Sequence, residues 1–421
     1  MRYDAIFRDV AGNVLHDYAG YDEKKARHDS LFFSASCQKA QRRGHLNDLV
    51  FLQLMNQYLA TMQDRNLQFR LSDGGYQPGT RGFHVRSYEG RLYVTEVWQE
   101  TGLACGDQII TLGGVPPALY KKRLPRNILG SDEEERELWD PILKMSGPCL
   151  IKHRDGTDET RKLERFPISG KLPRLGGRLI GRNTLYLDLP HFTDAQALAK
   201  LLTAKEKSLN RCTKLILDLR HNIGGSETFF VPLLDYIMET PVLLRDLYEE
   251  KGLYTNYTES NCRRKTQMLR NYLPNAGESE KELVETMIQE LREKSGLGMV
   301  WEEDEELKAD ETVVGGAGRF DRVVILSDTY CEYAGETFIQ LCRRSKKVTV
   351  LGRPTMGNID YCNPVSILYG GRFTFRYPMS KTKAAMEGHG VSGRGVPVDL
   401  YVPWTPQECG EDILLQKAVA L

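Results

Sequence analysis

The sequence predicts a multidomain α/β (α+β) protein with a helical N-terminal region, a β-rich module and a mixed α/β core. Residues 1–72 show the helical spacing of apolar residues, whereas short alternating stretches separated by Gly and Pro begin at Gly74. From about residue 175 onwards, buried-strand patterns alternate with helical segments, which favours a mixed, partly parallel sheet covered by helices. A chain of 421 residues is long enough for two or three such domains.

The composition excludes several classes of partner. The 57 basic and 57 acidic residues cancel, so no long-range field would attract nucleic acid or an anionic membrane. The N-terminus lacks the pattern of a secretory signal, and no apolar run of about 18 residues would span a bilayer. Nine scattered cysteines without a CxxC pair indicate reduced thiols in a cytoplasmic protein. We expect no nucleic-acid partner, no membrane span, no cofactor and no metal site.

The N-terminal region, residues 1–72, is expected to be a structural helical unit. Asn47 and Asp48 would cap a helix whose apolar residues cover much of its circumference. Such a helix packs on more than one side, so the region is interpreted as scaffold.

The β-rich module is placed at residues 76–166. Its first part, TRGFHVRSYEGRLYVTEVW, alternates on both sides of Gly90, and a second hairpin is expected to turn at Asp155-Gly156. With Gly82-Phe83 at the head of a strand and a "GDQII…GG" turn after it, the module resembles a PDZ domain. The resemblance implies capture of an extended peptide by strand addition, with the amides near Gly82 and Phe83 receiving a terminal carboxylate.

The core is placed at residues 175–421, with a charged helical insertion at about 249–318. Helical segments separate several of its predicted strands, as is typical of α/β proteins. These strands are Leu185–Leu189, Lys214–Leu219, Val323–Leu326, Val348–Leu351 and Phe373–Tyr377.

A strand, a turn and a helix follow one another within "RVVILSDTYCEYAGETFIQLC", which begins at Arg322. Enzymes with α/β folds often place a nucleophile on such a turn, because it exposes one side chain beside the positive end of the helix. The turn carries Cys331, Glu332 and Tyr333, which makes it the first candidate for chemistry.

A second candidate is the Gly-Gly loop that follows a buried strand in "LILDLRHNIGG". Gly224 and Gly225 lack a Cβ, so their backbone amides approach a ligand closely. Such amides stabilise the negative charge that develops in acyl transfer.

These motifs occur in a fixed order with "VTVLGRPTMGN" and "GRGVPVDLYVPW". Together with the upstream module they resemble the C-terminal processing (tail-specific) serine peptidase family over roughly residues 76–421. The resemblance implies action on polypeptide or protein C-termini by a Ser nucleophile with a Lys base. The Gly-Gly loop and the amide after the Ser, here Ala334, would form the oxyanion hole.

The two catalytic positions carry other residues in this chain. The family's Ser lies three places before an acidic residue, here Glu336, so Tyr333 occupies the Ser position. The family's Lys follows the Gly of a "T-aromatic-G-K" loop, whereas here Gly357 is followed by Asn358. Asn is no proton acceptor, and a phenol with a pKa near 10 is a poor acyl acceptor, so the Ser/Lys mechanism is expected to be lost.

Three interpretations stay open at this point. The chain is a pseudo-peptidase that binds polypeptides in a PDZ-gated cleft without cutting them, or a thiol hydrolase in which Cys331 is the displaced nucleophile. A thiol nucleophile needs a nearby cation, which His191, His221 or His389 would supply. The third interpretation is an unrecognised chemistry on the same scaffold.

Overall fold

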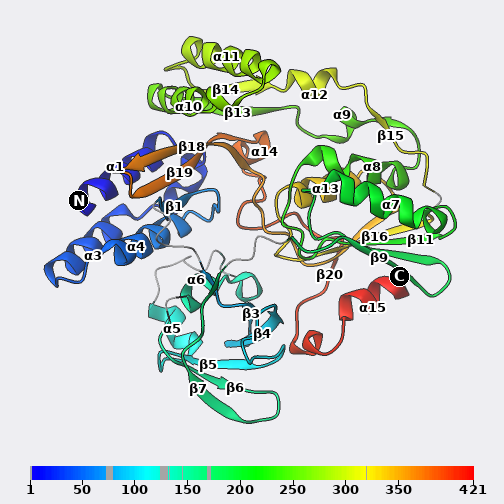
Figure 1. Ribbon diagram of the computed structural model, residues 1–421, viewed down its shortest axis with the longest axis horizontal. Helices are drawn as coiled ribbons and strands as arrows, with labels where there is room; N and C mark the ends of the chain where they lie inside the picture. Colours follow the sequence, from blue (N-terminus) through cyan, green and yellow to red (C-terminus); the bar gives the residue numbers. More distant parts are fainter. Residues whose placement is uncertain are drawn as a thin grey trace. The chain divides into compact units, whose positions relative to one another are not determined.

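The computed structural model describes residues 2–72, 79–123, 131, 133–144, 146–167, 172–318 and 320–421. The first residues of the predicted β module, 76–78, lie outside this part. The chain forms two compact units (Figure 1). Unit 1 combines three segments, 1–76, 250–308 and 358–392, and unit 2 combines 77–249, 309–357 and 393–421.

Unit 1 is built on a five-stranded antiparallel sheet. Its central strand, β19 (Phe373–Lys381), pairs along its whole length with β18 (Tyr361–Tyr369). On its other side β19 pairs first with β1 (Gln68–Leu71) and then with β13 (Gly252–Tyr257), which forms a hairpin with β14 (Gly298–Glu303). Three distant segments of the chain therefore share one sheet.

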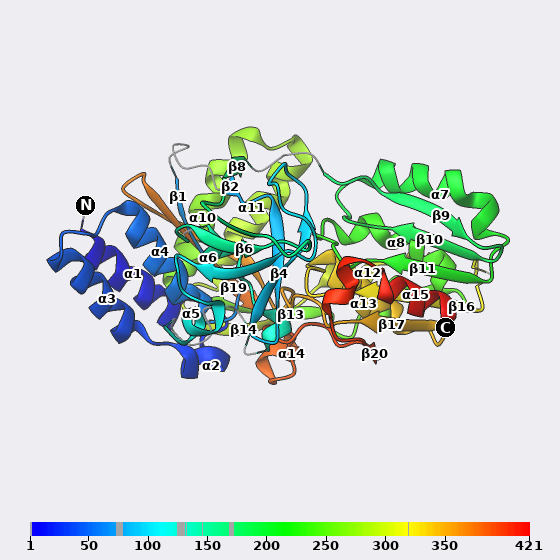
Figure 2. The same cartoon turned by 90° about the horizontal axis from the view of Figure 1, so that it is seen from below.

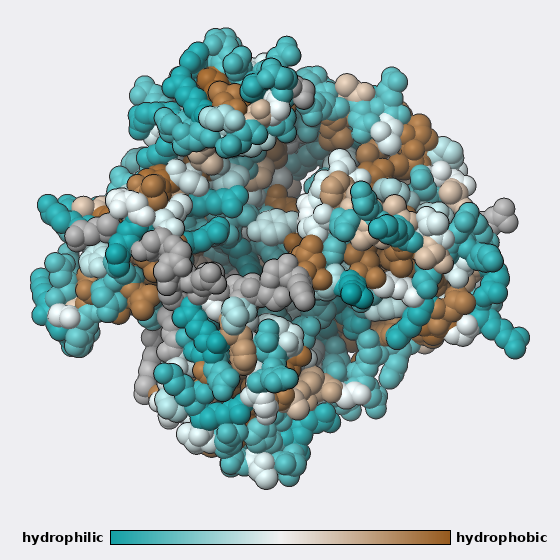
Figure 3. All heavy atoms as spheres, in the orientation of Figure 1, coloured by the Kyte–Doolittle hydropathy of each residue, from teal (hydrophilic) through white to brown (hydrophobic). Residues whose placement is uncertain are grey.

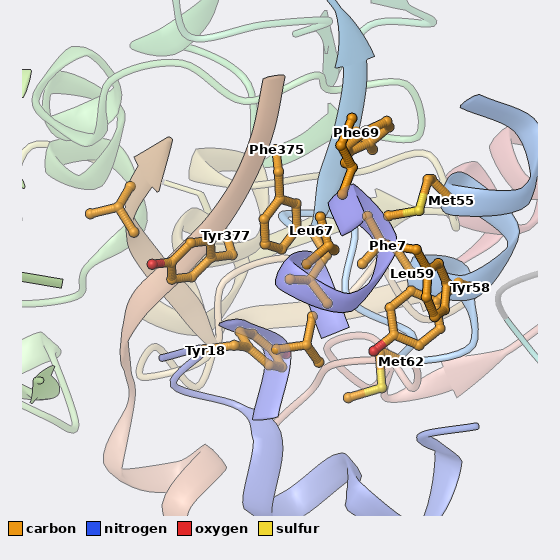
Figure 4. Close-up of a cluster of buried hydrophobic side chains, with 14 of the residues drawn as sticks. Phe7, Tyr18, Met55, Tyr58, Leu59, Met62, Leu67, Phe69, Phe375 and Tyr377 are labelled. Carbon is orange, nitrogen blue, oxygen red and sulfur yellow. The ribbon is translucent and has the colours of Figure 1, made fainter. Parts of the chain in front are cut away.

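The N-terminal helices close the core of unit 1. They are α1 (Tyr3–His16), α2 (Tyr21–Lys24), α3 (Ser30–Arg42) and α4 (Asp48–Ala60). Asn47 accepts a hydrogen bond from the amide of Val50 at 3.0 Å, which confirms the predicted cap of α4. Figure 4 shows the resulting aromatic cluster, in which Phe7 and Tyr58 from the helices meet Phe69 and Phe375 from the sheet. This contact surface is apolar on both sides, so burial stabilises the helices on the sheet.

The charged insertion contributes to unit 1. It supplies β13, α10 (Glu259–Tyr272), α11 (Glu278–Glu293), β14 and α12 (Glu305–Ala309). Cys262 and Leu291 on the inner faces of α10 and α11 join the same core as the N-terminal helices. The outer faces of these two helices are mostly hydrophilic (Figure 3). The insertion is therefore a packed part of a sheet-and-helix unit.

Unit 2 contains a six-stranded sheet in the order β20-β17-β16-β11-β10-β9. All neighbouring pairs are parallel except the edge pair β9–β10, which is antiparallel. The strands are β9 (Gly176–Ile180), β10 (Thr184–Asp188), β11 (Lys214–Asp218), β16 (Arg322–Ser327), β17 (Val348–Gly352) and β20 (Leu400–Tyr401).

Helices cover both faces of this sheet (Figures 1 and 2). On one face lie α7 (Ala195–Leu209), α8 (Glu227–Ile237) and α13 (Ala334–Cys342), and on the other lies α15 (Ile413–Ala420). Leu414 and Ala418 of α15 pack on Ile216, Val324 and Leu326 of the central strands. The short elements of this region are α9 (Leu244–Leu247), the pair β12 (Val242–Leu243) and β15 (Val313–Val314), and the 3₁₀ turn η4 (Pro406–Cys409).

A second sheet of unit 2 is antiparallel, in the order β3-β4-β5-β6-β7. We refer to it as the β module. Both predicted hairpins are confirmed: β3 and β4 turn at Glu89-Gly90, and β6 and β7 turn around Gly156. Its strands are β3 (Phe83–Tyr88), β4 (Arg91–Val97), β5 (Gln108–Leu112), β6 (Cys149–Lys152) and β7 (Asp158–Arg161), with β2 (Gly79–Thr80) pairing β8 (Phe166–Pro167) beside them. The short helices α5 (Pro117–Arg123), η2 (Glu134–Arg136) and α6 (Asp140–Leu143) complete it.

The predicted α/β fold class is confirmed, and one predicted strand has a different place. The segment Phe373–Tyr377 is part of β19 and belongs to the antiparallel sheet of unit 1, because it pairs with β1, β13 and β18. Within the described residues, no helix is long and apolar enough to cross a bilayer.

Candidate active site

The turn between β16 and α13, residues 328–333, is the centre of the candidate site, and we call it the elbow turn. Tyr333 closes it with φ 49° and ψ −119°, a conformation that a residue with a Cβ adopts only under strain. A sharp strand-to-helix turn that ends in such a residue is the arrangement that presents a nucleophile in α/β hydrolases. Tyr333 thus stands at the position where a nucleophile would be expected.

The carboxylate of Glu336 fixes the elbow turn. Glu336 is fully buried and accepts hydrogen bonds from the amide of Tyr333 at 3.1 Å and from the amide of Gly357 at 2.6 Å. It also accepts one from the hydroxyl of Thr355 at 2.5 Å. Because Thr355 and Gly357 belong to the loop 353–357, which we call the glycine-rich loop, this one carboxylate holds the loop against the turn.

The Gly-Gly loop, residues 219–226, lies directly against Tyr333. Gly224 has φ 82°, and a Cβ added there would lie 2.7 Å from the Cβ of Tyr333. Gly225 has φ 140°, and a Cβ there would lie 2.1 Å from the backbone oxygen of Phe192. Both positions therefore require glycine: Gly224 because Tyr333 of the elbow turn lies against it, and Gly225 because the backbone of Phe192 does.

Asn222 links the Gly-Gly loop to the elbow turn. Its side chain is fully buried, accepts from the amide of Gly224 at 2.9 Å and donates to the carbonyl of Leu189 at 2.6 Å. Its backbone carbonyl accepts from the amide of Glu332 at 2.8 Å. Sequence reasoning missed this role, because a polar residue beside two glycines is an equally good turn residue on the surface.

Among the described residues, two of the three backbone amides predicted to form the oxyanion hole have no hydrogen-bond acceptor. Within the described residues, the N–H groups of Gly225 and Ala334 make no hydrogen bond, whereas that of Gly224 is taken by Asn222. Ala334 is the first residue of α13, where the helix dipole favours negative charge. This arrangement has the chemistry to receive an anionic or carbonyl oxygen.

Cys331 lies on the elbow turn but is fully buried. Burial raises the pKa of its thiol well above the usual range, and the carboxylates of Glu336 and Glu332 add to the effect. A Cβ added at Gly335 would lie 2.9 Å from its sulfur, so helix α13 covers the thiol closely. These surroundings keep Cys331 protonated and enclosed, which is the opposite of what a nucleophilic thiol needs.

The three candidate histidines lie in different surroundings. His191 is buried, with its ring bonded to the carbonyl of Pro173 at 3.0 Å and to the hydroxyl of Thr193 at 2.9 Å. His389 belongs to unit 1. His221 is exposed and stacks on the ring of Tyr330 in the elbow turn, with 5.7 Å between ring centroids.

A histidine of the β module also reaches the elbow turn. His84 of β3 stacks on Tyr330 with 4.9 Å between centroids, and its Nδ1 lies 2.9 Å from a carboxylate oxygen of Asp140. Sequence reasoning gave no signal for His84, because its neighbours come from three separate segments.

Buried ion pairs join the β module to the elbow turn. Asp328 pairs with Arg86 of β3 and with Arg353 of the glycine-rich loop, each at 2.8 Å. Burial opposes ionisation of Asp328, but the two guanidinium groups outweigh it and lower the pKa of the carboxyl. From η2, Arg136 donates to three carbonyls of the glycine-rich loop, those of residues 354, 355 and 356, at 3.0, 2.8 and 3.2 Å.

The predicted peptide-binding residues head strand β3. Phe83 is buried in the core of the β module. The amide of Gly82 donates to the hydroxyl of Thr80 at 3.1 Å, and its carbonyl accepts from the amide of Trp98 at 2.9 Å. Strand β3 itself is the end strand of its sheet.

Asn358, at the position expected for the base, follows the glycine-rich loop and belongs to unit 1. It is buried there, and its carbonyl accepts a hydrogen bond from the side chain of Asn66 at 3.1 Å. An asparagine in this place has no basic nitrogen to offer.

The family model of peptidase family S41 matches residues 183–402, more than half of the chain. The chain belongs to peptidase family S41. The matched range includes the Gly-Gly loop, the elbow turn and the glycine-rich loop, so the resemblance to C-terminal processing peptidases is confirmed. No curated protein matches the chain significantly.

Solved structures of S41-type fold are similar over nearly the whole chain. Mature CPAF complexed with lactacystin matches with a TM-score of 0.65 and 12% identity, over 99% of this chain and 97% of that chain. Mature CPAF matches with a TM-score of 0.63 and 12% identity, over 99% and 95%. The photosystem II D1 C-terminal processing protease matches with a TM-score of 0.44 and 13% identity, over 97% and 94%. The two CPAF structures thus share the fold of this S41 family protein.

Proposed function

We propose that this S41 family protein binds polypeptide C-termini without cleaving them by Ser/Lys chemistry. The observation that carries the proposal is the residue at the strained end of the elbow turn. Tyr333 has the backbone conformation of a nucleophile position, yet it brings a phenol, and its Cβ closely approaches Gly224. A scaffold that retains the strained turn and two free amides while lacking the nucleophile suits binding better than acyl transfer.

The β module supports peptide binding by strand addition. Because β3 is at the end of its sheet, its outer backbone groups would pair with an extended peptide, as in PDZ domains. The module's η2 turn contacts β3, where the carboxylate of Glu134 accepts from the hydroxyl of Ser87 at 3.2 Å. Arg136 of the same turn holds the glycine-rich loop. A peptide that displaces η2 would therefore release that loop, which is the gating we propose.

A thiol hydrolase is the weaker alternative. Cys331 is enclosed, and its carboxylate-rich surroundings favour the protonated thiol. We therefore assign Cys331 to packing under α13. The nine cysteines are all free thiols, which supports placing the protein in a reducing compartment such as the cytoplasm.

The test combines binding and cleavage assays on the full chain. Unstructured polypeptides with free and amidated C-termini should bind, with preference for the free carboxylate, and mass spectrometry should detect no cleavage products. Fluorophosphonate should leave the wild-type protein unlabelled, and iodoacetamide should not reach Cys331 before unfolding. Cleavage by the wild-type protein that is lost in Cys331→Ala, but kept in the matched buried control Cys342→Ala, would contradict the proposal.

A gain-of-function variant tests whether the rest of the catalytic site is functional. The double substitution Tyr333→Ser and Asn358→Lys restores the residue types that the family uses. Cleavage or fluorophosphonate labelling by the double variant, absent from each single variant, would support the assignment of both positions. An inert double variant that still binds polypeptides would show that more of the catalytic site has been lost.

A further inference from the structure

Two cysteines from distant parts of unit 2 lie side by side. Cys105 lies in the loop between β4 and β5 of the β module, and Cys409 ends η4 near the C-terminus. The thiol of Cys105 donates to the carbonyl of Thr95 at 3.0 Å, and that of Cys409 to the adjacent carbonyl of Val94 at 3.6 Å. Because these two carbonyls belong to consecutive residues of β4, the two thiols lie at the same stretch of that strand. Neither is in a disulfide, and both are half-buried, so a small oxidant would reach them.

The two thiols differ in acidity. The hydrogen bond from Cys409 lowers the pKa of Cys105, and the nearby guanidinium of Arg154 assists while burial opposes. The pKa of Cys409 is raised by the same hydrogen bond and by burial. By contrast, burial raises the pKa of Cys362, the third half-buried cysteine, to about 12. Cys105 is thus suited to attack, with Cys409 next to it as the resolving thiol.

We propose that Cys105 and Cys409 are a redox modification site, at which a small-molecule disulfide such as glutathione disulfide installs an intramolecular cross-link. The Cys105 thiolate attacks one sulfur of the oxidant, forms a mixed disulfide and expels one thiolate. Cys409 then attacks the sulfur of Cys105, and its proton passes to the second thiolate that leaves. In total, two cysteine thiols are oxidised, and one disulfide is reduced to two thiols.

The cross-link would tie the β module to the C-terminal segment of the peptidase core. The residue before Cys409 is Glu408, whose carboxylate pairs with the buried guanidinium of Arg353. Arg353 in turn pairs with Asp328 of the elbow turn at 2.8 Å. Oxidation would therefore fix the β module close to the ion pairs that hold the elbow turn, a form of control that does not depend on whether a peptide is bound or cleaved.

The test uses the full chain in buffers with increasing ratios of glutathione disulfide to glutathione. Peptide mapping without reductant should detect Cys105 linked to Cys409 in the monomer, with the mass of two hydrogen atoms lost, and dithiothreitol should reverse the link. Cys105 should react at least about tenfold faster than Cys362, because its thiolate is more populated.

Three variants identify the order of events. Cys409→Ser should trap Cys105 as a mixed disulfide with glutathione, whereas Cys105→Ser should leave Cys409 reduced. The matched control, Cys362→Ser, should form the cross-link at the wild-type rate. A stable mixed disulfide in the wild-type protein, a cross-link between two chains, or Cys362 oxidised as fast as Cys105 would each overturn the proposal. The mapping of the wild-type protein decides this even where a variant fails to fold.

Discussion

The strain at Tyr333 can be measured by comparing Tyr333→Gly with Tyr333→Ala. Both variants remove the ring, but only glycine adopts φ 49° and ψ −119° without strain. A residue with a Cβ in such a region costs about 1–3 kcal/mol. Glycine loses about 0.5–1 kcal/mol through its greater freedom in the unfolded chain. We therefore expect Tyr333→Gly to be the more stable of the two by about 1 kcal/mol.

The same two substitutions at Gln340 serve as a control, and here we expect the alanine variant to be the more stable one. Gln340 is exposed in the interior of α13, where glycine is about 1 kcal/mol less favourable than alanine. Urea unfolding of the four variants, with the slope m unchanged, should show the order of midpoints reversed between the two sites. If glycine also destabilises position 333 relative to alanine by the amount seen at 340, the elbow turn is unstrained and the reasoning fails.

Three further predictions concern the contacts around the elbow turn. Arg136→Ala should lower the free energy of unfolding by about 3 kcal/mol, because three carbonyls of the glycine-rich loop lose charged donors, and urea midpoints would detect this. Asp328→Asn should cost about 3–5 kcal/mol at pH 7, since it leaves the guanidinium of Arg86 buried without its carboxylate partner. Because the pKa of Asp328 is lowered in the folded state, its contribution is present above about pH 4 and is lost as the pH falls further. In thermal melts, the melting temperature of the variant should therefore fall less steeply with decreasing pH in the acid range than that of the wild-type protein. Gly225→Ala would place a Cβ 2.1 Å from the backbone oxygen of Phe192, and we expect it to abolish folding of unit 2, as measured by circular dichroism of the expressed protein.

The fold of the parallel sheet could be predicted from local sequence. Buried strands carry continuous apolar runs, so β10, β11, β16 and β17 were located to within about two residues of their observed ends. Which strands pair could not be predicted from local sequence, because pairing joins segments that are distant in the chain. The pattern of Phe373–Tyr377 indicated a strand, but not that it would pair with β1 and β13 in unit 1.

In the candidate site, too, local features could be predicted from the sequence, whereas features that depend on the surroundings could not. The strand-turn-helix pattern and the two glycines are local signals, and they indicated the elbow turn and the Gly-Gly loop. The identity of a residue is also a sequence fact, so the prediction that Tyr333 and Asn358 occupy the family's Ser and Lys positions needed no structure. Burial is a property of the surroundings, and only the structure showed that Cys331 is enclosed by α13.

The sequence by itself therefore determined the family and the position of the elbow turn, and it predicted that Tyr333 and Asn358 stand at the positions of the family's nucleophile and base. The tertiary structure alone decided which side chains meet there. Glu336 joins the turn to the glycine-rich loop, and Arg136 joins that loop to the β module. Cys105 and Cys409 donate to the carbonyls of adjacent residues in β4, although no spacing in the chain connects them. The physical reason is that apolar periodicity and turn chemistry act over a few residues, whereas hydrogen bonds, ion pairs and thiol contacts depend on how distant segments pack.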